Sequence, residues 1–137
     1  MIQTKNPAIA RKCVLIIEDD PLSMKMFNAM IAAQGYHVLQ ATDGARGLEL
    51  AHQEHPDLIV TDVQMPGISG LEVSRLLKAD EDTRDIPIIV TTAVSLDEEE
   101  VRASGCDGFM AKPITIWAFL ELIETMMKEP RAARHTD

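Results

Sequence analysis

Residues 56–62 read PDLIVTD, and the tripeptide Met65-Pro66-Gly67 follows shortly afterwards. A short apolar run that is bounded by a proline and by a Pro-Gly turn is typical of a fully buried parallel strand. Such a strand would bring the carboxylate of Asp62 to its carboxyl end, where open α/β sheets bind their ligands. This stretch therefore predicts both an α/β fold and a first candidate site residue.

A second apolar run, CVLII at residues 13–17, leads directly into Glu18, Asp19 and Asp20. Two strands that bring carboxylates to one edge of a sheet create a site for a hard cation. The carboxylates would raise one another's pKa unless another charge offset theirs, and Mg²⁺ suits a site of one or two carboxylates, waters and a phosphoryl oxygen. The acids could instead cap strand ends and face solvent, and taken alone they leave both interpretations open.

Two more segments add other polar groups to the same edge. The apolar segment 86–91 runs into Thr92, and the segment 108–111 is followed by Lys112. A lysine that follows a buried strand is expected to have an anionic partner, and the pocket acids supply one. Carboxylates, a hydroxyl and an ammonium together can bind a metal, accept a phosphoryl group and hold the transferred oxygens.

Strand-like and helix-like segments alternate along the chain. We expect strands at 12–17, 36–40, 57–61, 86–91 and 107–110, and helices at about 21–34, 44–54, 69–79, 96–104 and 114–128. This alternation predicts one parallel sheet with helices on both faces. The apolar face of the first helix is expected at Leu22, Met26, Met30 and Ala33, and that of the last at Ile116, Phe119, Leu120, Ile123 and Met127.

The overall composition limits the classes of protein to which this chain can belong. A chain of 137 residues with 46% hydrophobic and 26% charged residues is an ordinary globular domain, expected at 12–128 between a flexible arm at 1–11 and a disordered tail at 129–137. A net charge of −9 disfavours nucleic acid as a direct partner. The sequence has no membrane-span or signal-peptide pattern, and Cys13 and Cys106 lack metal-ligand spacing, so we expect a cytoplasmic protein with two small buried thiols.

Five short motifs are arranged in order along the chain: Glu18-Asp19, Asp62, Met65-Pro66-Gly67, Thr92-Ala93 and Lys112-Pro113. Together they resemble the receiver domain of bacterial two-component response regulators, over roughly residues 11–128. Each motif alone is weak, but the set in this order and spacing is highly specific. The resemblance implies a single (βα)5 flavodoxin-like, doubly wound parallel sheet with strand order 2-1-3-4-5.

The resemblance also implies a metal site. Asp19 would be the main ligand of Mg²⁺, which Mn²⁺ could replace, and Glu18 would contact the ion directly or through water. Asp62 and the backbone carbonyl of Gln64 would complete the protein ligands. Asp20 is expected to face solvent or to support the acidic pair.

The same resemblance implies phosphoryl chemistry and a switch. Asp62 would accept the phosphoryl group of a histidine kinase or of a small donor. Thr92 would bond one phosphoryl oxygen, and Lys112, expected before a cis peptide bond to Pro113, would pair with another. Phe109 matches the switch aromatic that turns inward when the threonine moves, although it could instead be a constantly buried core residue.

Output would be partner binding, since nothing like an effector domain follows in this sequence. The output surface would include part of 96–104 and Trp117, which could instead be packed into a helix contact. The segment between Thr92 and Lys112 is about two residues shorter than in many receivers, which makes partner recognition by analogy less safe.

Among receivers, the chain is most similar to small stand-alone regulators of the DivK type, which act in cell-cycle signalling. The likeness lies in residues 23–27, 70–73 and 105–114. It implies sensor histidine kinases as partners, and also a phosphotransfer protein or a kinase-regulating partner. We expect a monomer or weak dimer that does not insert into membranes.

Two rival functions remain open. A metal-dependent phosphohydrolase with an aspartyl-phosphate intermediate commonly carries a second acid two residues after its nucleophile, where this chain has Gln64. A receiver that is never phosphorylated usually lacks one of the acids, the threonine or the lysine, all of which this chain has. We therefore expect no enzyme activity beyond self-phosphorylation and slow self-dephosphorylation.

Overall fold

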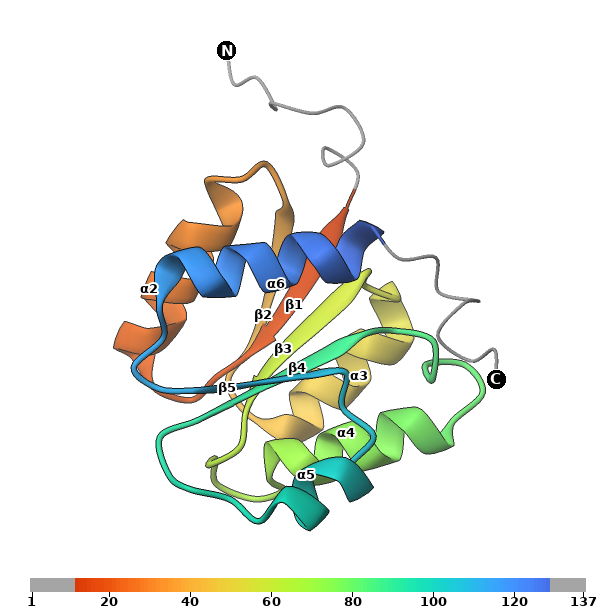
Figure 1. Cartoon of the computed structure of the whole chain (residues 1–137). Coiled ribbons are helices and arrows are strands. Elements are labelled where there is room, and N and C mark those ends of the chain that lie inside the picture. The colour runs from red at the N-terminus through yellow and green to blue at the C-terminus, as the bar shows by residue number, and fades with distance from the viewer. Residues whose placement is uncertain (1–11, 129–137) are drawn as a thin grey trace.

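The computed structural model describes residues 12–128, so the expected arm at 1–11 and tail at 129–137 lie outside the described residues. Strands and helices alternate along this range (Figure 1). The strands are β1 (Cys13–Ile17), β2 (His37–Ala41), β3 (Leu58–Asp62), β4 (Ile88–Thr92) and β5 (Gly108–Ala111). The helices are α2 (Pro21–Ala32), α3 (Gly44–Glu54), α4 (Gly70–Ala79), α5 (Glu98–Ala103) and α6 (Ile116–Lys128). Every expected element forms, with bounds that differ by at most two residues.

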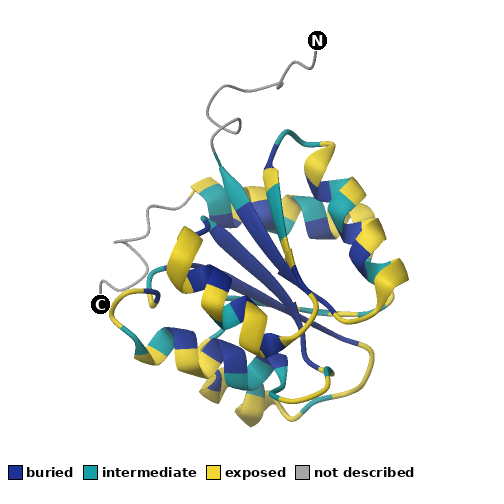
Figure 2. Ribbon diagram, turned by 180° about the vertical axis from the view of Figure 1, so that it is seen from behind, coloured by how far each residue is buried: buried dark blue, intermediate teal, exposed yellow. Residues whose placement is uncertain are grey.

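The strands form one parallel sheet in the order β2-β1-β3-β4-β5, which confirms the predicted fold class. Helices α2 and α6 cover one face, and α3, α4 and α5 cover the other (Figure 1). The centre of the sheet is buried on both faces, as Figure 2 shows. None of the helices within residues 12–128 is long and apolar enough to cross a membrane.

The apolar face predicted for α2 is wrong. Leu22 is 76% exposed and Met26 is 47% exposed, whereas Met24, Phe27 and Ile31 point into the core. Two apolar stripes run along this helix, and the buried one carries Phe27, whose ring lies 5.3 Å from that of Phe119 on α6. A bulky aromatic pair of this kind excludes more apolar surface from water than the competing methionines would.

The face predicted for α6 is largely correct, since Phe119 and Ile123 are fully buried, although Ile116 is 52% exposed. Both cysteines are half-buried rather than buried. Burial, followed by the charge of the nearby Asp57, raises the pKa of the Cys13 thiol to about 11. The thiol is therefore protonated at neutral pH and nucleophilically weak.

Candidate functional site

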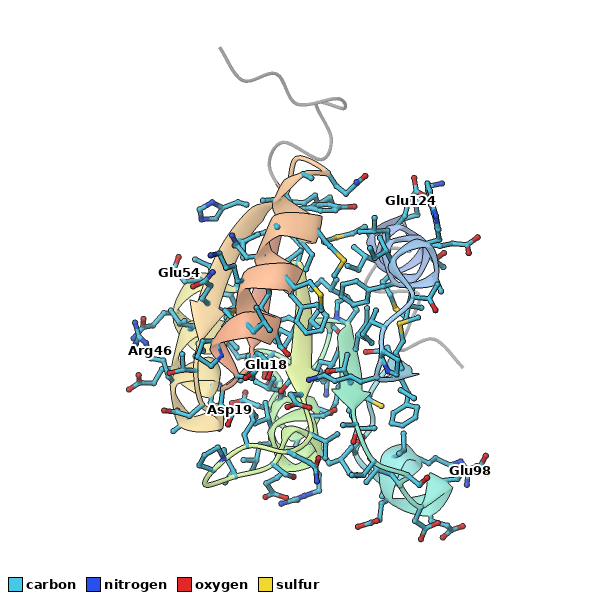
Figure 3. All side chains as sticks on the ribbon, turned by 90° about the vertical axis from the view of Figure 1, so that its left-hand side faces the viewer. Glu18, Asp19, Arg46, Glu54, Glu98 and Glu124 are labelled. Carbon is cyan, nitrogen blue, oxygen red and sulfur yellow. The ribbon has the colours of Figure 1, made fainter. Side chains whose placement is uncertain are left out.

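The carboxyl edge of the sheet gathers the polar residues singled out in the sequence. Glu18 follows β1 directly, Asp62 is the last residue of β3, and Lys112 follows β5. Because the strands are parallel, their carboxyl ends share one edge. Figure 3 shows Glu18 and Asp19 together at this edge, beside the start of α2.

Three carboxylates form a cluster there. Ligand oxygens of Glu18, Asp19 and Asp62 all lie within 4.8 Å of one another. Glu18 is 1% exposed and Asp62 is 7% exposed, whereas Asp19 is open to solvent. Two buried oxygen donors and one that solvent reaches are a suitable set for a hard divalent cation that keeps part of its water shell.

Electrostatics at Glu18 reflect the crowding of these acids. Burial raises the pKa of Glu18, and the negative charge of Asp62 adds to the rise. The backbone N–H of Asp20, which donates to Oε2 at 3.2 Å, and the Lys112 ammonium act in the opposite direction. A bound cation would oppose the same rise, because it favours the ionised form of each carboxyl group.

Lys112 reaches across the sheet into this cluster. Its Nζ donates to Glu18 Oε1 at 3.1 Å and lies 3.6 Å from Asp62 Oδ2. The ammonium also lies 6.0 Å from the centre of the Phe27 ring. The Lys112–Pro113 peptide bond is cis, as expected.

Thr92 ends β4 on the neighbouring strand and is fully buried. Its hydroxyl donates to the carbonyl of Val94 at 3.3 Å and accepts from the N–H of Val94 at 3.2 Å. The hydroxyl is therefore engaged within the loop after β4. The structure brings Glu18, Asp19, Asp62 and Lys112 into contact, while Thr92 lies beside them with its hydroxyl bonded elsewhere.

The loop between β3 and α4 holds the remaining candidate ligand, and a glycine fixes its course. Gln64 is exposed in this loop, two residues beyond Asp62. The loop folds back so that Gly70 N donates to Val63 O at 3.0 Å. A methyl group on Gly70 would overlap the backbone carbonyl of Asp62. The sequence analysis included Gly70 only in the segment 70–73 that resembles DivK-type regulators, and it missed that this glycine packs against the site.

Asp20 has a structural role that the sequence analysis also missed. Its side chain accepts from the N–H of Ser23 at 2.9 Å and caps α2, whose first residue is Pro21. An aspartate immediately before a proline is a recognisable start signal for a helix, so this cap could have been read from the sequence.

The two expected output aromatics are both exposed, which makes their buried alternatives wrong. Phe109 is 40% exposed and Trp117 is 84% exposed. They line separate hollows. Phe109 lies beside Leu96 and Val101, whereas Trp117 lies beside Tyr36 and beside other residues of α6. The predicted output surface is therefore divided between two separate hollows.

Comparison with known proteins agrees with this geometry. Residues 14–124 match the family model of the response regulator receiver domain. The polar-differentiation response regulator DivK of Brucella ovis is 44% identical over 118 residues, which cover 85% of this chain and 96% of the relative. The DivK of Brucella anthropi is 42% identical over the same shares.

Solved structures of receivers are similar as well. The receiver domain of sensor histidine kinase PA1611 from Pseudomonas aeruginosa, with a magnesium ion coordinated in its active site cleft, has a TM-score of 0.80 at 28% identity. The match covers 86% of this chain and 98% of that one. The chemotaxis protein CheY4 of Vibrio cholerae has a TM-score of 0.78 at 26% identity, over 84% of this chain and 98% of its own.

The family match extends from the start of β1 well into α6, and it takes in the acidic cluster, Thr92 and Lys112. Curated relatives that are matched over almost their full length are response regulators too. The sheet order, the acids at its carboxyl edge and the lysine that reaches them all lie within the matched range. This chain therefore belongs to the response regulator receiver domain family.

Proposed function

We propose that this receiver domain is a phosphorylation switch whose phosphoacceptor is Asp62. The observation that carries the proposal is the acidic cluster of Glu18, Asp19 and Asp62 with the Lys112 ammonium 3.6 Å from Asp62 Oδ2. Phosphoryl transfer depends mainly on positioning and charge stabilisation, and this cluster supplies both beside one nucleophilic carboxylate. The domain at 12–128 is the functional unit.

The proposed reaction forms an acyl phosphate. A carboxylate oxygen of Asp62 attacks the phosphorus of a phosphohistidine, the phosphorus–nitrogen bond breaks, and its electron pair leaves with the imidazole. Lys112 pairs with one oxygen of the transferred group, and the Thr92 hydroxyl bonds another. In a slow later step water attacks the phosphorus and restores the Asp62 carboxylate.

Asp19, Glu18 and Asp62 would hold Mg²⁺ or Mn²⁺, together with the backbone carbonyl of Gln64. The bound cation would neutralise charge on the transferred oxygens and reduce the repulsion between the acids. The oxygen-rich donor set supports this assignment, and a solved relative contains magnesium in its active site cleft.

The arrangement of Thr92 and Phe109 supports the proposed conformational step. The Thr92 hydroxyl is bonded to Val94, and Phe109 is 40% exposed, as expected of the unphosphorylated state. Phosphorylation draws the hydroxyl away from Val94, the vacated space admits the Phe109 ring, and the surface around α5 changes. A partner that binds one form better shifts the population toward it.

The proposed partners follow from the similarity to DivK. Sensor histidine kinases supply the phosphoryl group, and a phosphotransfer protein or a kinase-regulating partner reads the result in the cytoplasm. An exposed Gln64, where related phosphohydrolases carry an acid, disfavours turnover of substrates. A phosphate-independent module is disfavoured because the buried Asp62 and the partly buried Lys112 lie in one charged cluster.

The first experiment is intact-mass analysis after incubation with Mg²⁺ and acetyl phosphate. We expect one phosphoryl adduct on the wild type, none on Asp62→Asn and none without Mg²⁺. Asp82→Asn, an exposed acid on a distant loop, is the matched control and should label normally. If neither acetyl phosphate nor a phosphorylated histidine kinase labels the wild type, the protein is a phosphate-independent binding module.

A further inference from the structure

Thr91 is a buried residue whose side chain lacks a hydrogen bond. Among the buried side-chain nitrogen and oxygen atoms of residues 12–128, Thr91 Oγ1 is the one without a partner, and the residue is fully buried. An unpartnered buried hydroxyl costs about 1–3 kcal/mol, whereas a valine would fill the same space at no such cost. The hydroxyl therefore weakens the resting fold.

The register of the sheet shows where this hydroxyl lies. Thr91 on β4 is the direct partner of Asp62 on β3. Along β4, Ile89 packs into the core under α2 and α6, and Val90 packs into the opposite core. Side chains alternate along a strand, so Thr91 faces the α2 and α6 side, as Val60 and Asp62 do.

Lys112 must pass over this position to make its contacts. It follows β5, whereas its partners Asp62 and Glu18 belong to β3 and β1, on the far side of β4. Neighbouring strands are about 4.8 Å apart, so the lysine side chain crosses the end of β4 on the face that Thr91 occupies. The ammonium has three N–H groups, and Glu18 and Asp62 attract two of them.

A cation that enters the acidic cluster competes with Lys112 for the Glu18 carboxylate. The ammonium then needs another acceptor, and a carboxylate shared with a divalent cation is a poorer one. We infer that Thr91 is a positioning residue that accepts a hydrogen bond from the Lys112 ammonium once a divalent cation binds. This inference deepens the proposed function and rests on it for its role in phosphoryl transfer, because it holds the lysine beside Asp62.

The test is a calorimetric titration with Mg²⁺ alone of the wild type, Thr91→Val, Lys112→Met and the double variant. Thr91→Val should weaken Mg²⁺ binding about tenfold, as expected for one lost hydrogen bond to a charged group. In the Lys112→Met background the same substitution should change nothing, because the donor is gone. Thr91→Ser, which retains the hydroxyl, should bind Mg²⁺ as the wild type does.

Thr83→Val is the matched control. Thr83 is equally buried, but its hydroxyl donates to Leu77 O at 2.8 Å far from the site. Its replacement should lower the melting temperature and leave Mg²⁺ binding unchanged, whereas Thr91→Val should raise the melting temperature of the metal-free protein.

The rate of labelling by acetyl phosphate gives a second readout, and it should fall for Thr91→Val and recover for Thr91→Ser. Equal Mg²⁺ affinity in the wild type and Thr91→Val, or an equal loss with and without Lys112, overturns the inference. If Mg²⁺ affinities behave as expected but the wild type never labels, the proposed function fails while the lysine–threonine contact stands.

Discussion

The two edges of the sheet each hold a partly buried lysine, and they differ in how fully its charge is paired. At the amino edge, Lys78 Nζ donates to two backbone carbonyls at 2.8 and 3.1 Å and to Asp107 Oδ2 at 2.9 Å. At the carboxyl edge, Lys112 bonds Glu18 at 3.1 Å and stays 3.6 Å from Asp62. At the amino edge the three N–H groups of the Lys78 ammonium have three acceptors. At the carboxyl edge the Lys112 ammonium donates to Glu18, and its remaining N–H groups are available to a ligand.

The carboxylates repeat this contrast. Asp57 accepts from the backbone N–H of Cys13 at 2.8 Å, and Asp107 accepts from that of Ile88 at 2.8 Å, so these acids tie strand starts together. At the other edge burial and Asp62 raise the pKa of Glu18. Asp57 and Asp107 stabilise the fold through their hydrogen bonds. Glu18 and Asp62 repel each other and lower the stability of the fold, but together they can bind a cation.

The largest expected effects come from removing each lysine. Lys112→Met should slow labelling by acetyl phosphate about 100-fold or more, because it removes a charge that stabilises the transferred oxygens. It should also destabilise the metal-free protein, because Glu18 is left buried beside Asp62 without its cation. Lys78→Met should lower the free energy of unfolding by about 3 kcal/mol, because Asp107 is left partly buried without its cation. Its folded fraction should still label at the wild-type rate.

Chemical denaturation and labelling measured on both variants test this contrast. The contrast between the edges fails if Lys78→Met slows labelling of the folded protein as much as Lys112→Met does.

Two glycines, one in the loop between β3 and α4 and one at the start of α4, allow the effect of close packing to be measured separately from that of backbone strain. Gly70→Ala would press a methyl group against the backbone carbonyl of Asp62, so we expect a loss of about 2–3 kcal/mol and slower labelling as Asp62 shifts. Gly67 has a φ of +83° and open space around it. Gly67→Ala should therefore cost only about 1–2 kcal/mol for the left-handed conformation and leave labelling unchanged.

Denaturant titration measures the loss of stability in both alanine variants, and labelling by acetyl phosphate shows whether Asp62 has shifted. Equal labelling rates for the two variants would show that Asp62 does not depend on the close approach of Gly70.

The carboxyl edge was predictable because its residues end apolar runs. Glu18, Asp62 and Lys112 each follow or close a strand, and parallel strands place such residues at one edge whatever the details of packing. The fold and strand order followed from the same alternation and from the family motifs. The roles of the individual residues stay predictions until they are tested.

The amino edge was not predictable from local pattern. Lys78 lies on α4 and meets Asp107 across 29 positions of sequence, so their contact depends on how α4 packs. The buried face of α2 was mistaken because its two apolar stripes are equally regular in sequence. Packing against the sheet and against Phe119 selects the stripe that contains Phe27. The exposure of Trp117 likewise depends on tertiary packing.

Replacing one acid at each edge should change the melting temperature by a smaller amount, with opposite signs at the two edges. Asp19→Asn should raise the melting temperature of the metal-free protein by about 3 °C, because it relieves repulsion in the cluster, and should abolish the stabilisation by Mg²⁺. Asp57→Asn should lower the melting temperature and leave the Mg²⁺ effect intact, since Asp57 accepts from Cys13. Thermal unfolding with and without Mg²⁺ checks both signs, and a destabilised Asp19→Asn would contradict the contrast.

The smallest expected effect lies on the surface near the amino edge, where solvent screens the charges. His52 Nε2 lies 2.9 Å from Asp80 Oδ2, and this contact, followed by one to the carbonyl of Leu48, raises the pKa of His52. The pKa of Asp80 is lowered, chiefly by His52 and then by the N–H of Asp82. Both groups are about half exposed, so the pair is worth little.

The sign of the pH dependence follows from these directions. The stability that His52 contributes is complete below its unfolded pKa of about 6.5 and is lost as pH rises through the higher folded value. The contribution of Asp80 is present above its unfolded pKa of about 3.9 and is lost as pH falls through the lower folded value. Asp80→Asn should therefore destabilise the protein slightly at pH 5 to 6 and much less at pH 9. An equal loss at both pH values would mean that the pair acts through packing and not through charge.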